Sequence, residues 1–196
     1  PSSKSGVIVM NDEEKTGGMP MPQDECRTSR LFTCDVPYLM PLFSATDIPW
    51  ELLPRIKEYV AALVADGIEG FTHYSDTVLI GQNVRIYPGV VIEGPAVIGH
   101  GCELRPGAFI RGAVITGEKC VIGNSTELKN CILLSHVDVP HYNYVGDSVL
   151  GQYAHLGAGT VCSNLKSDKQ NVVIHTEPQS PTGLRKCGAL LGDHVE

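Results

Sequence analysis

One short stretch of the chain gathers residue types suited to acid–base chemistry. Residues 136–144 read His-Val-Asp-Val-Pro-His-Tyr-Asn-Tyr, and a histidine can accept a proton near neutral pH. With Glu127 or Asp138 to orient its ring, His141 would suit removal of a proton from an amine or a hydroxyl group. The alternative interpretation is that His141 fills a contact between subunits.

Charged residues at a fixed spacing form a second candidate group. Glu93, Arg111 and Lys129 lie eighteen residues apart, so they stack on one outer face if the chain repeats with that period. Two stacked cations repel each other unless an anion lies nearby, and Glu93 or a bound phosphate could supply it. A solvated ladder of surface charges is the alternative.

The elements that must position these residues follow a six-residue repeat. Aliphatic residues recur at every sixth position, with one interruption at Thr116: Ile80, Ile86, Ile92, Ile98, Leu104, Ile110, Ile122, Leu128 and Leu134. A second, mostly apolar column lies two residues before each of them. Because side chains alternate across a strand, two apolar residues spaced by two indicate the inward face of a short strand.

Glycines indicate the length of the larger repeat. Gly81, Gly99 and Gly117 are eighteen residues apart, which predicts a coil of three short strands and three corners. Such coils bury their apolar edges against one another in a solenoid, and the three- and four-residue steps of a helix are absent. The sequence therefore predicts an all-β solenoid, a parallel β-helix of hexapeptide repeats, over residues 78–196.

The N-terminal part of the chain lacks this repeat. Residues 1–46 are predicted to be a tail and an irregular segment, with residues 31–46 along the flank of the solenoid. Residues 47–77 are predicted to be a helical cap docked on the first coil, with Asp47 at the start of its helix and Gly67 at the end.

Two interruptions are predicted within the coils. The six-residue phase is lost after Leu134, and Pro140 stands where an inward aliphatic residue is due, so residues 135–147 are predicted to bulge out as a loop. Residues 165–183 are polar and contain prolines, which predicts a second loop. The fresh hexad at residues 191–196 predicts that further coils follow.

Composition narrows the class of protein. A net charge of −7 and the lack of a long basic run argue against nucleic acid or an anionic membrane as the main partner. The sequence has neither an apolar run of about 20 residues nor a signal-peptide pattern. An odd number of cysteines, seven, fits a reducing compartment, so a cytoplasmic protein is predicted.

Three stretches together resemble one enzyme family. They are Glu-Leu-Lys-Asn at residues 127–130, His-Tyr-Asn-Tyr-Val-Gly-Asp at 141–147, and Leu-Gly-Ala-Gly-Thr at 156–160 followed by Asn164. They resemble the acetyltransferase domain of the bifunctional N-acetylglucosamine-1-phosphate uridyltransferase and glucosamine-1-phosphate acetyltransferase. The glycine-rich nucleotide loop that a uridyltransferase needs is absent from this chain.

The resemblance implies both a handedness and a reaction. Parallel crossovers are right-handed in about 98% of cases, so the left-handed coil expected here comes from the family. His141 matches the base that removes a proton from a sugar amine as the amine attacks the thioester of acetyl-CoA, and Glu127 matches a carboxylate that supports it. Backbone amides near Gly157–Ala158 or at Tyr144 would polarise the thioester carbonyl. No metal is expected.

The resemblance also implies binding residues. Those that match sugar-phosphate ligands are Arg111, Lys129, Tyr144 and, across the predicted loop, Lys186. Ala158 and Asn164 match positions that line the CoA site, which in this family lies between subunits of a homotrimer. The chain departs from the family at His155, where an asparagine faces the sugar, and at Leu165, where an aromatic residue is expected. A sugar phosphate and a nucleotide sugar both remain open as acceptors.

Two other functions are weighed against the acetyltransferase. A non-catalytic sugar-nucleotide-binding or scaffold protein would explain His155 and Leu165. A zinc enzyme of the γ-carbonic-anhydrase kind would use His136 and His141, which are five residues apart, with His100 as third ligand. Two full coils separate His100 from His136, and with strands about 4.8 Å apart this places them about 10 Å from each other.

Overall fold

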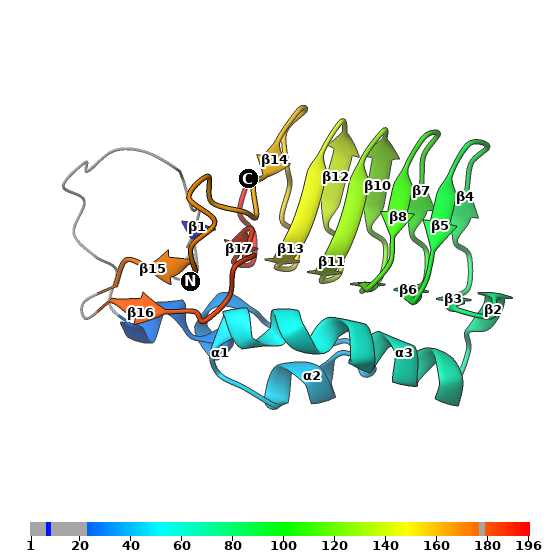
Figure 1. Ribbon diagram of the computed structural model, residues 1–196. Helices are drawn as coiled ribbons and strands as arrows, with labels where there is room; N and C mark the ends of the chain where they lie inside the picture. The colour runs from blue at the N-terminus through cyan, green and yellow to red at the C-terminus, as the bar shows by residue number, and fades with distance from the viewer. Residues whose placement is uncertain (1–6, 9–22, 177–178) are drawn as a thin grey trace.

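A computed structural model describes residues 7–8, 23–176 and 179–196. Its main body is a left-handed parallel β-helix of about five coils, as predicted from the repeat and the resemblance. Figure 1 shows short strands stacked coil upon coil, with helices along one side. The coils therefore have one face covered by helices and two that are not.

The strands fall on three faces of the solenoid. The helix-covered face contains β3 (Val78–Ile80), β6 (Ala96–Ile98), β9 (Val114–Thr116), the C-terminal halves of β11 (Glu127–Leu133) and β13 (Tyr144–Leu150), and β17 (Leu190–Leu191). The second face contains β4 (Arg85–Ile86), β7 (Glu103–Leu104), β10 (Val121–Asn124) and β12 (Asp138–His141). The third face contains β5 (Val91–Glu93), β8 (Phe109–Arg111), the N-terminal halves of β11 and β13, and β14 (Val161–Cys162).

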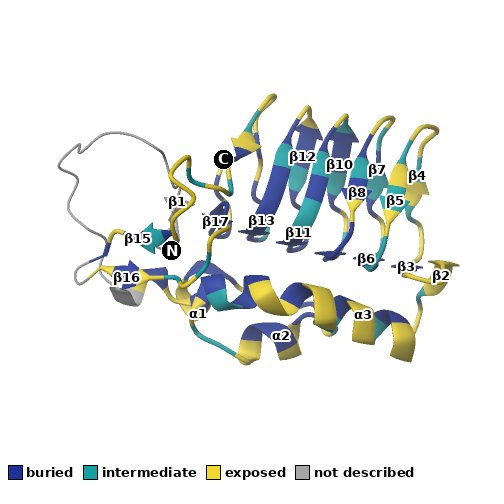
Figure 2. Ribbon diagram, in the orientation of Figure 1, coloured by how far each residue is buried: buried dark blue, intermediate teal, exposed yellow. Residues whose placement is uncertain are grey.

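The interior of the coils is filled by the apolar columns seen in the sequence. Leu104, Ile110, Ile122 and Leu128 are completely buried there, and Figure 2 shows the strands next to the helices mostly as buried. Full burial of such a side chain contributes about 1.5–3 kcal/mol. The repeat thus stabilises the solenoid through contacts between neighbouring coils.

The coil shortens from eighteen to seventeen residues part-way along the solenoid. Val78 pairs with Ala96 and Ala96 with Val114, whereas Val114 pairs with Cys131, seventeen residues later. The missing residue is at the corner between the third face and the helix-covered face, where Asn130 alone replaces a two-residue turn. Asn130 has φ 47°, a left-handed conformation that asparagine tolerates better than most residues.

This shortening corrects two predictions. Residues 135–147 do not bulge out as a loop, because β12 and β13 pair in register with β10 and β11. Val139, next to Pro140, is the inward residue of β12 and is completely buried. Leu134, predicted to point into the coil, instead packs against the helices.

The predicted N-terminal helix is present but not as a cap on the first coil. It consists of a 3-10 helix, η2 (Pro49–Arg55), followed by α3 (Ile56–Asp66). α3 lies along the flank and contacts β6, β9 and β11 in turn (Figure 1). Its apolar stripe packs on the outward residues of the helix-covered face, so burial of that face explains its position.

The preceding segment follows the same flank, as predicted for residues 31–46. It contains η1 (Gln23–Cys26), α1 (Thr28–Leu31) and α2 (Met40–Ser44). Leu39 and Leu42 are buried in the same apolar layer as α3. The predictions for the first residues of the chain fall outside the described part, apart from β1 (Val7–Ile8), which pairs antiparallel with β17.

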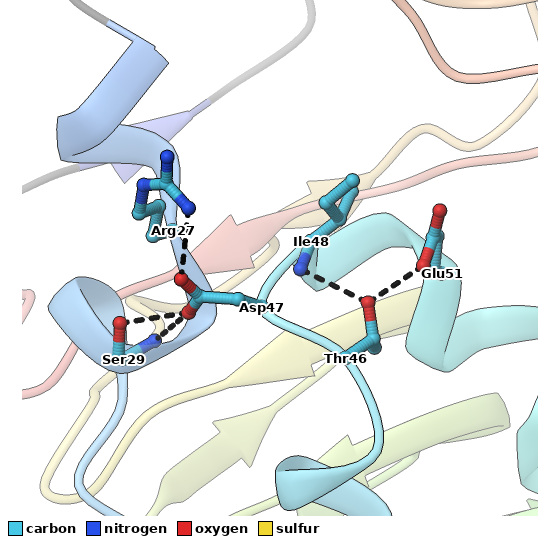
Figure 3. Close-up of polar contacts among 6 residues, drawn as sticks. All are labelled: Arg27, Ser29, Thr46, Asp47, Ile48 and Glu51. Carbon is cyan, nitrogen blue, oxygen red and sulfur yellow. Dashed lines mark hydrogen bonds and ion pairs between the residues drawn. The ribbon is translucent and has the colours of Figure 1, made fainter.

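Asp47 joins two helical segments instead of capping the one that follows it. Its Oδ1 accepts hydrogen bonds from the backbone N–H of Ser29 at 3.0 Å and the hydroxyl of Ser29 at 2.7 Å (Figure 3). Arg27 adds an ion pair at 3.1 Å. Thr46 holds the start of η2, because its hydroxyl accepts a hydrogen bond from Ile48 N–H and donates one to Glu51.

The chain leaves the coils after β14 and returns at β17. Leu190 pairs with Val149, 41 residues earlier, so an insertion separates two neighbouring coils. It contains the hairpin of β15 (Val173–Ile174) and β16 (Ser180–Pro181), which lies beyond the coils in Figure 1. At the other end of the solenoid, β2 (Thr72–Ser75) pairs antiparallel with β3.

Two further features of the described chain are the length of its helices and the state of its cysteines. Within the described ranges, no helix is long and apolar enough to span a bilayer. The seven cysteines all lie in described positions, and each is a free thiol. Cys102 and Cys120 stack in successive coils, where both are completely buried.

Candidate active site

The third face brings together four of the predicted site residues. Arg111 comes from β8, while Glu127 and Lys129 lie in β11 and Tyr144 in β13. Glu127 pairs directly with Tyr144, and Glu93 with Arg111, which confirms that this part of the charged column stacks. The parallel register of the coils therefore places these side chains on one surface.

Arg111 and Glu127 form an ion pair between neighbouring coils. Arg111 Nη1 donates to Glu127 Oε1 at 2.9 Å, and the two side chains are 50% and 32% exposed. The hydrogen bond to Glu127 raises the pKa of the Arg111 guanidinium above its ordinary value, and the charge of Tyr144 in its ionised form would add to this. The arginine is thus fixed beside Tyr144 with part of its surface open to a ligand.

Tyr144 is half-buried beside these charges. Burial raises the pKa of its phenol above the ordinary value, and Asn164, which donates to the phenol oxygen at 3.3 Å, lowers it in part. The hydroxyl therefore stays protonated at neutral pH and can donate a hydrogen bond to an anionic ligand.

A ladder of polar side chains follows at the corner beyond Tyr144. The buried carboxylate of Asp147 accepts from Asn130 Nδ2 at 2.7 Å in the coil before and from Asn164 Nδ2 in the coil after. Like Asn130, Asp147 has a left-handed backbone, φ 48°. This ladder fixes Asn164, a predicted CoA-site residue, next to Tyr144.

His141 lies at the opposite end of the third face, at the corner that follows β12. Its imidazole is exposed and, among the described residues, makes no hydrogen bond or ion pair. The His141 carbonyl accepts from Gly159 N–H at 3.0 Å, so the histidine stacks on the corner that contains Ala158. The predicted base and one predicted CoA-site residue are therefore neighbours.

Asn143 holds this corner and did not stand out in the sequence. Its side chain is buried, accepts a hydrogen bond from His141 N–H at 3.0 Å and donates to Gly157 O at 2.8 Å. Its own carbonyl accepts from Glu127 N–H at 2.9 Å. The position of Asn143 two residues after a candidate base was the only signal available.

The backbone amides proposed to polarise a carbonyl differ in availability. Tyr144 N–H donates to Thr160 O at 3.1 Å, so that amide is already engaged. The amides of Gly157 and Ala158 are not bonded to any described residue and lie on an exposed corner. The amides of Gly157 and Ala158 are therefore available as donors, whereas that of Tyr144 is not.

Two predicted residues lie away from this group. His155 is on the second face beside Asp138, whose carboxylate lies 4.0 Å from its Nδ1. Lys186 lies on the return of the insertion, where it pairs with Leu165, and borders a cavity of about 420 Å³. Arg185 borders the same cavity and was not predicted.

The three histidines of the zinc alternative do not converge. The ring of His100 lies 4.6 Å from that of Phe71, and the ring of His136 is stacked on Tyr153 at 4.5 Å. In the part of the chain described, no group of three or more histidine, cysteine or acidic side chains could hold a metal ion.

Comparison with known proteins identifies the family. The profile of the GMPPB C-terminal domain matches residues 92–196, which is more than half of the chain. The chain belongs to the GMPPB C-terminal domain family. This family match covers every predicted site residue, from Arg111 to Lys186.

Relatives of this member of the family confirm the resemblance seen in the sequence. "Bifunctional protein GlmU" of Methanococcus maripaludis (strain DSM 14266) is 32% identical over 151 residues, 76% of this chain and 37% of the relative. A "Bifunctional sugar-1-phosphate nucleotidylyltransferase/acetyltransferase" of Sulfurisphaera tokodaii is 39% identical over 75 residues, 38% of this chain and 19% of the relative. YaiX of Escherichia coli, named as an uncharacterized acetyltransferase, is 41% identical over 116 residues, 59% of this chain and 50% of the relative.

These names support the prediction that the chain is a transferase. The alignments span half or less of the length of each of these relatives. The Sulfurisphaera tokodaii relative is named for two activities, nucleotidylyl transfer and acetyl transfer.

Proposed function

We propose that this chain is an acetyl-CoA-dependent acetyltransferase that acts on an amino or hydroxyl group of a sugar phosphate or nucleotide sugar. The observation that carries the proposal is the register of β11, β12 and β13. Together with the bond from Gly159 N–H to the His141 carbonyl, this register brings the exposed His141 near Ala158 at one corner, with Arg111, Glu127 and Tyr144 on the adjoining face. The names of the relatives support the same chemistry.

The reaction needs a base beside a thioester. The acceptor nitrogen or oxygen attacks the carbonyl carbon of acetyl-CoA, forming a bond to that carbon, and the bond from carbon to sulfur breaks. His141 takes the proton that the acceptor loses and can pass it to the departing thiolate of CoA. The N–H of Gly157 or Ala158 would stabilise the negative charge that develops on the carbonyl oxygen.

The third face would hold the acceptor. Arg111, Lys129 and the Tyr144 hydroxyl supply donors to an anionic group, and arginine suits phosphate because its donors form a rigid fork. Glu127 orients Arg111 through their ion pair and reaches the His141 corner through its backbone bond to Asn143. We therefore assign Glu127 the role of positioning both Arg111 and the corner that holds His141.

Assembly would complete the site. His155 lies on the second face, away from Tyr144, so we propose that it reaches an acceptor bound to a neighbouring subunit of a homotrimer. Sedimentation of the protein should give three times the mass of one chain, and a monomeric mass would contradict this assembly.

The proposed compartment is a reducing cytoplasm, which fits free thiols at all seven cysteines.

The proposal is tested by following acetyl transfer directly. Protein and acetyl-CoA are incubated with glucosamine-1-phosphate or with an amino-sugar nucleotide, and release of the CoA thiol and the mass of the acceptor are both recorded. The proposal predicts thiol release matched by an acceptor heavier by one acetyl group. Binding of the sugar compound with no transfer would favour the non-catalytic alternative instead.

A further inference from the structure

A cavity opens at the far end of the third face from His141. It has a volume of about 420 Å³, within the range typical of small-molecule sites. Asn130 and Asp147, two members of the polar ladder, border it. They come from the repeating coils, whereas the rest of the lining does not.

The remaining walls come from segments outside the repeat. Leu53 and Pro54 of η2 form one side, and Leu184 with Arg185 from the insertion forms another. Both segments are hydrogen-bonded to the ladder. Asn130 Nδ2 donates to Leu53 O at 3.4 Å, and Gly188 N–H donates to the backbone carbonyl of Asp147 at 2.7 Å. The cavity is therefore built by this chain's own additions to the solenoid.

The arginine beside this cavity differs from the arginines of the coils. Arg85, Arg105 and Arg111 each pair with a glutamate. Arg185 and Lys186 are exposed, and neither has an ion-pair partner among the residues described. Two such cations beside apolar side chains suit a ligand that carries phosphate next to a flat apolar body.

The distance to the base limits the length of such a ligand. Asp147 lies three residues after Tyr144 in β13, which at about 3.3 Å per residue is about 10 Å, and His141 lies one corner further on. A ligand that occupies the cavity and also reaches His141 must extend along the whole third face. A sugar with a single phosphate is too short for this, whereas a sugar joined to a nucleoside diphosphate is long enough.

We propose that the cavity bordered by Arg185, Lys186 and Leu165 binds the nucleoside diphosphate of a nucleotide-sugar acceptor. The proposal rests on the acetyltransferase function and selects between its two acceptor classes. The sugar would lie with its reactive group at His141 and the phosphate joined to it beside Arg111 and Tyr144, and the nucleoside with its own phosphate would lie against η2 and the insertion. Arg185 is then a specificity-determining residue for the acceptor.

Calorimetric titration of UDP, GDP and ADP into the full chain tests this without relying on catalysis. Arg185→Ala removes one cation, and Leu165→Glu places a negative charge at the cavity. Lys57→Ala, which removes an exposed cation from α3, is the matched control. Each titration is repeated in the presence of saturating CoA, and melting temperatures show that the variants are folded.

The expected result is binding of at least one diphosphate, with Kd raised tenfold or more by Arg185→Ala and by Leu165→Glu. Lys57→Ala and CoA should leave that Kd unchanged. Binding of none of the three, equal binding by all variants, or displacement by CoA would overturn the proposal. Failure of the acetyltransferase proposal looks different, because diphosphate binding would persist while no acetyl group is transferred.

Discussion

At the scale of single residues, the candidate site depends on side chains that hold others in place. His141 is free to react because its corner is held by the buried Asn143, and not by bonds to its own ring. Arg111 is oriented by Glu127, while Asn164 is fixed by Asp147. The residues that would touch a substrate are thus exposed, and those that position them are more buried.

Arg111→Ala should weaken acceptor binding with little effect on stability. Loss of a charged hydrogen bond to a phosphate should raise KM for the acceptor about tenfold or more, since such bonds contribute about 1.5–3 kcal/mol. KM for acetyl-CoA should not change. Because the ion pair is exposed to solvent and screened, the free energy of unfolding should change little.

Arg85→Ala is the matched control for this experiment. Arg85 is also exposed and ion-paired, to Glu103, but it lies on the second face in an early coil. Steady-state kinetics on both variants, with each substrate varied in turn, checks the prediction. An acceptor KM that responds equally to the two substitutions would show that Arg111 does not bind the acceptor.

At the scale of elements, the repeat made the strands and faces predictable, but not every register. Strands of the helix-covered face are apolar on both sides, so Cys131-Ile-Leu-Leu134 carries no alternation from which to choose an inward residue. The one-residue deletion at Asn130 therefore leaves no signal in the sequence, which predicts the change of phase only after Leu134. The side on which α3 packs was equally hidden, because both the first coil and the flank offered apolar surface.

The candidate site was predictable to the extent that it depends on coil spacing. The eighteen-residue column placed Arg111 beside β5 correctly, and the stretch at residues 136–144 pointed to His141 before the family resemblance implied its role. Asp147 and Asn143 were missed because their roles depend on side-chain bonds between coils of seventeen residues. Arg185 was missed because nothing in a sequence fixes where an insertion folds back.

Asp47 should make the attachment of α1 sensitive to acid. The pKa of its carboxyl is lowered, first by the backbone N–H of Ser29, then by the Ser29 hydroxyl and Arg27. A folded pKa below the unfolded value of about 3.9 means that Asp47 adds stability above that pH and loses it as the pH falls through the folded pKa. Asp47→Asn should therefore destabilise the protein at pH 7, by less than about 1 kcal/mol because the pair is exposed.

Urea unfolding of wild type and Asp47→Asn at pH 7 and pH 3 measures this effect. The difference in free energy of unfolding between the two proteins should shrink at the lower pH. Ser29→Ala, which removes only one of the acceptor's partners, should show a smaller difference at pH 7. The same difference at both pH values would rule out a contribution from the ionised carboxylate.

Asp193 should contribute more, because its carboxylate is buried between the last coil and the N-terminal segment. It accepts from Thr33 N–H at 2.8 Å and from Gln152 N–H at 2.9 Å. Asp193→Ala leaves both amides without an acceptor, which should lower the free energy of unfolding by about 1–3 kcal/mol. Asp193→Asn keeps one oxygen and should cost less; unfolding curves that coincide with wild type for both variants would contradict this role.

At the scale of the whole molecule, a rigid solenoid presents a working face between two corners. One corner holds His141 and Ala158, and the other holds the polar ladder and the cavity. Helices cover one face of the coils, and the second and third faces are not covered by helices (Figure 2). The stack of coils fixes the distance between these two corners. Under the proposed function, changes at one corner would alter the reaction and changes at the other would alter selectivity for the acceptor.

The measurement that tests this account most directly is the rate of acetyl transfer by His141→Ala. A general base contributes about 10²–10⁴-fold, so the rate should fall at least about a hundredfold. The melting temperature should stay within error of wild type, because the exposed ring has no bonded partner among the described residues. His73→Ala, an exposed histidine on β2, should keep the full rate. Wild-type turnover by His141→Ala would contradict the assignment of the base and, with it, the proposed mechanism.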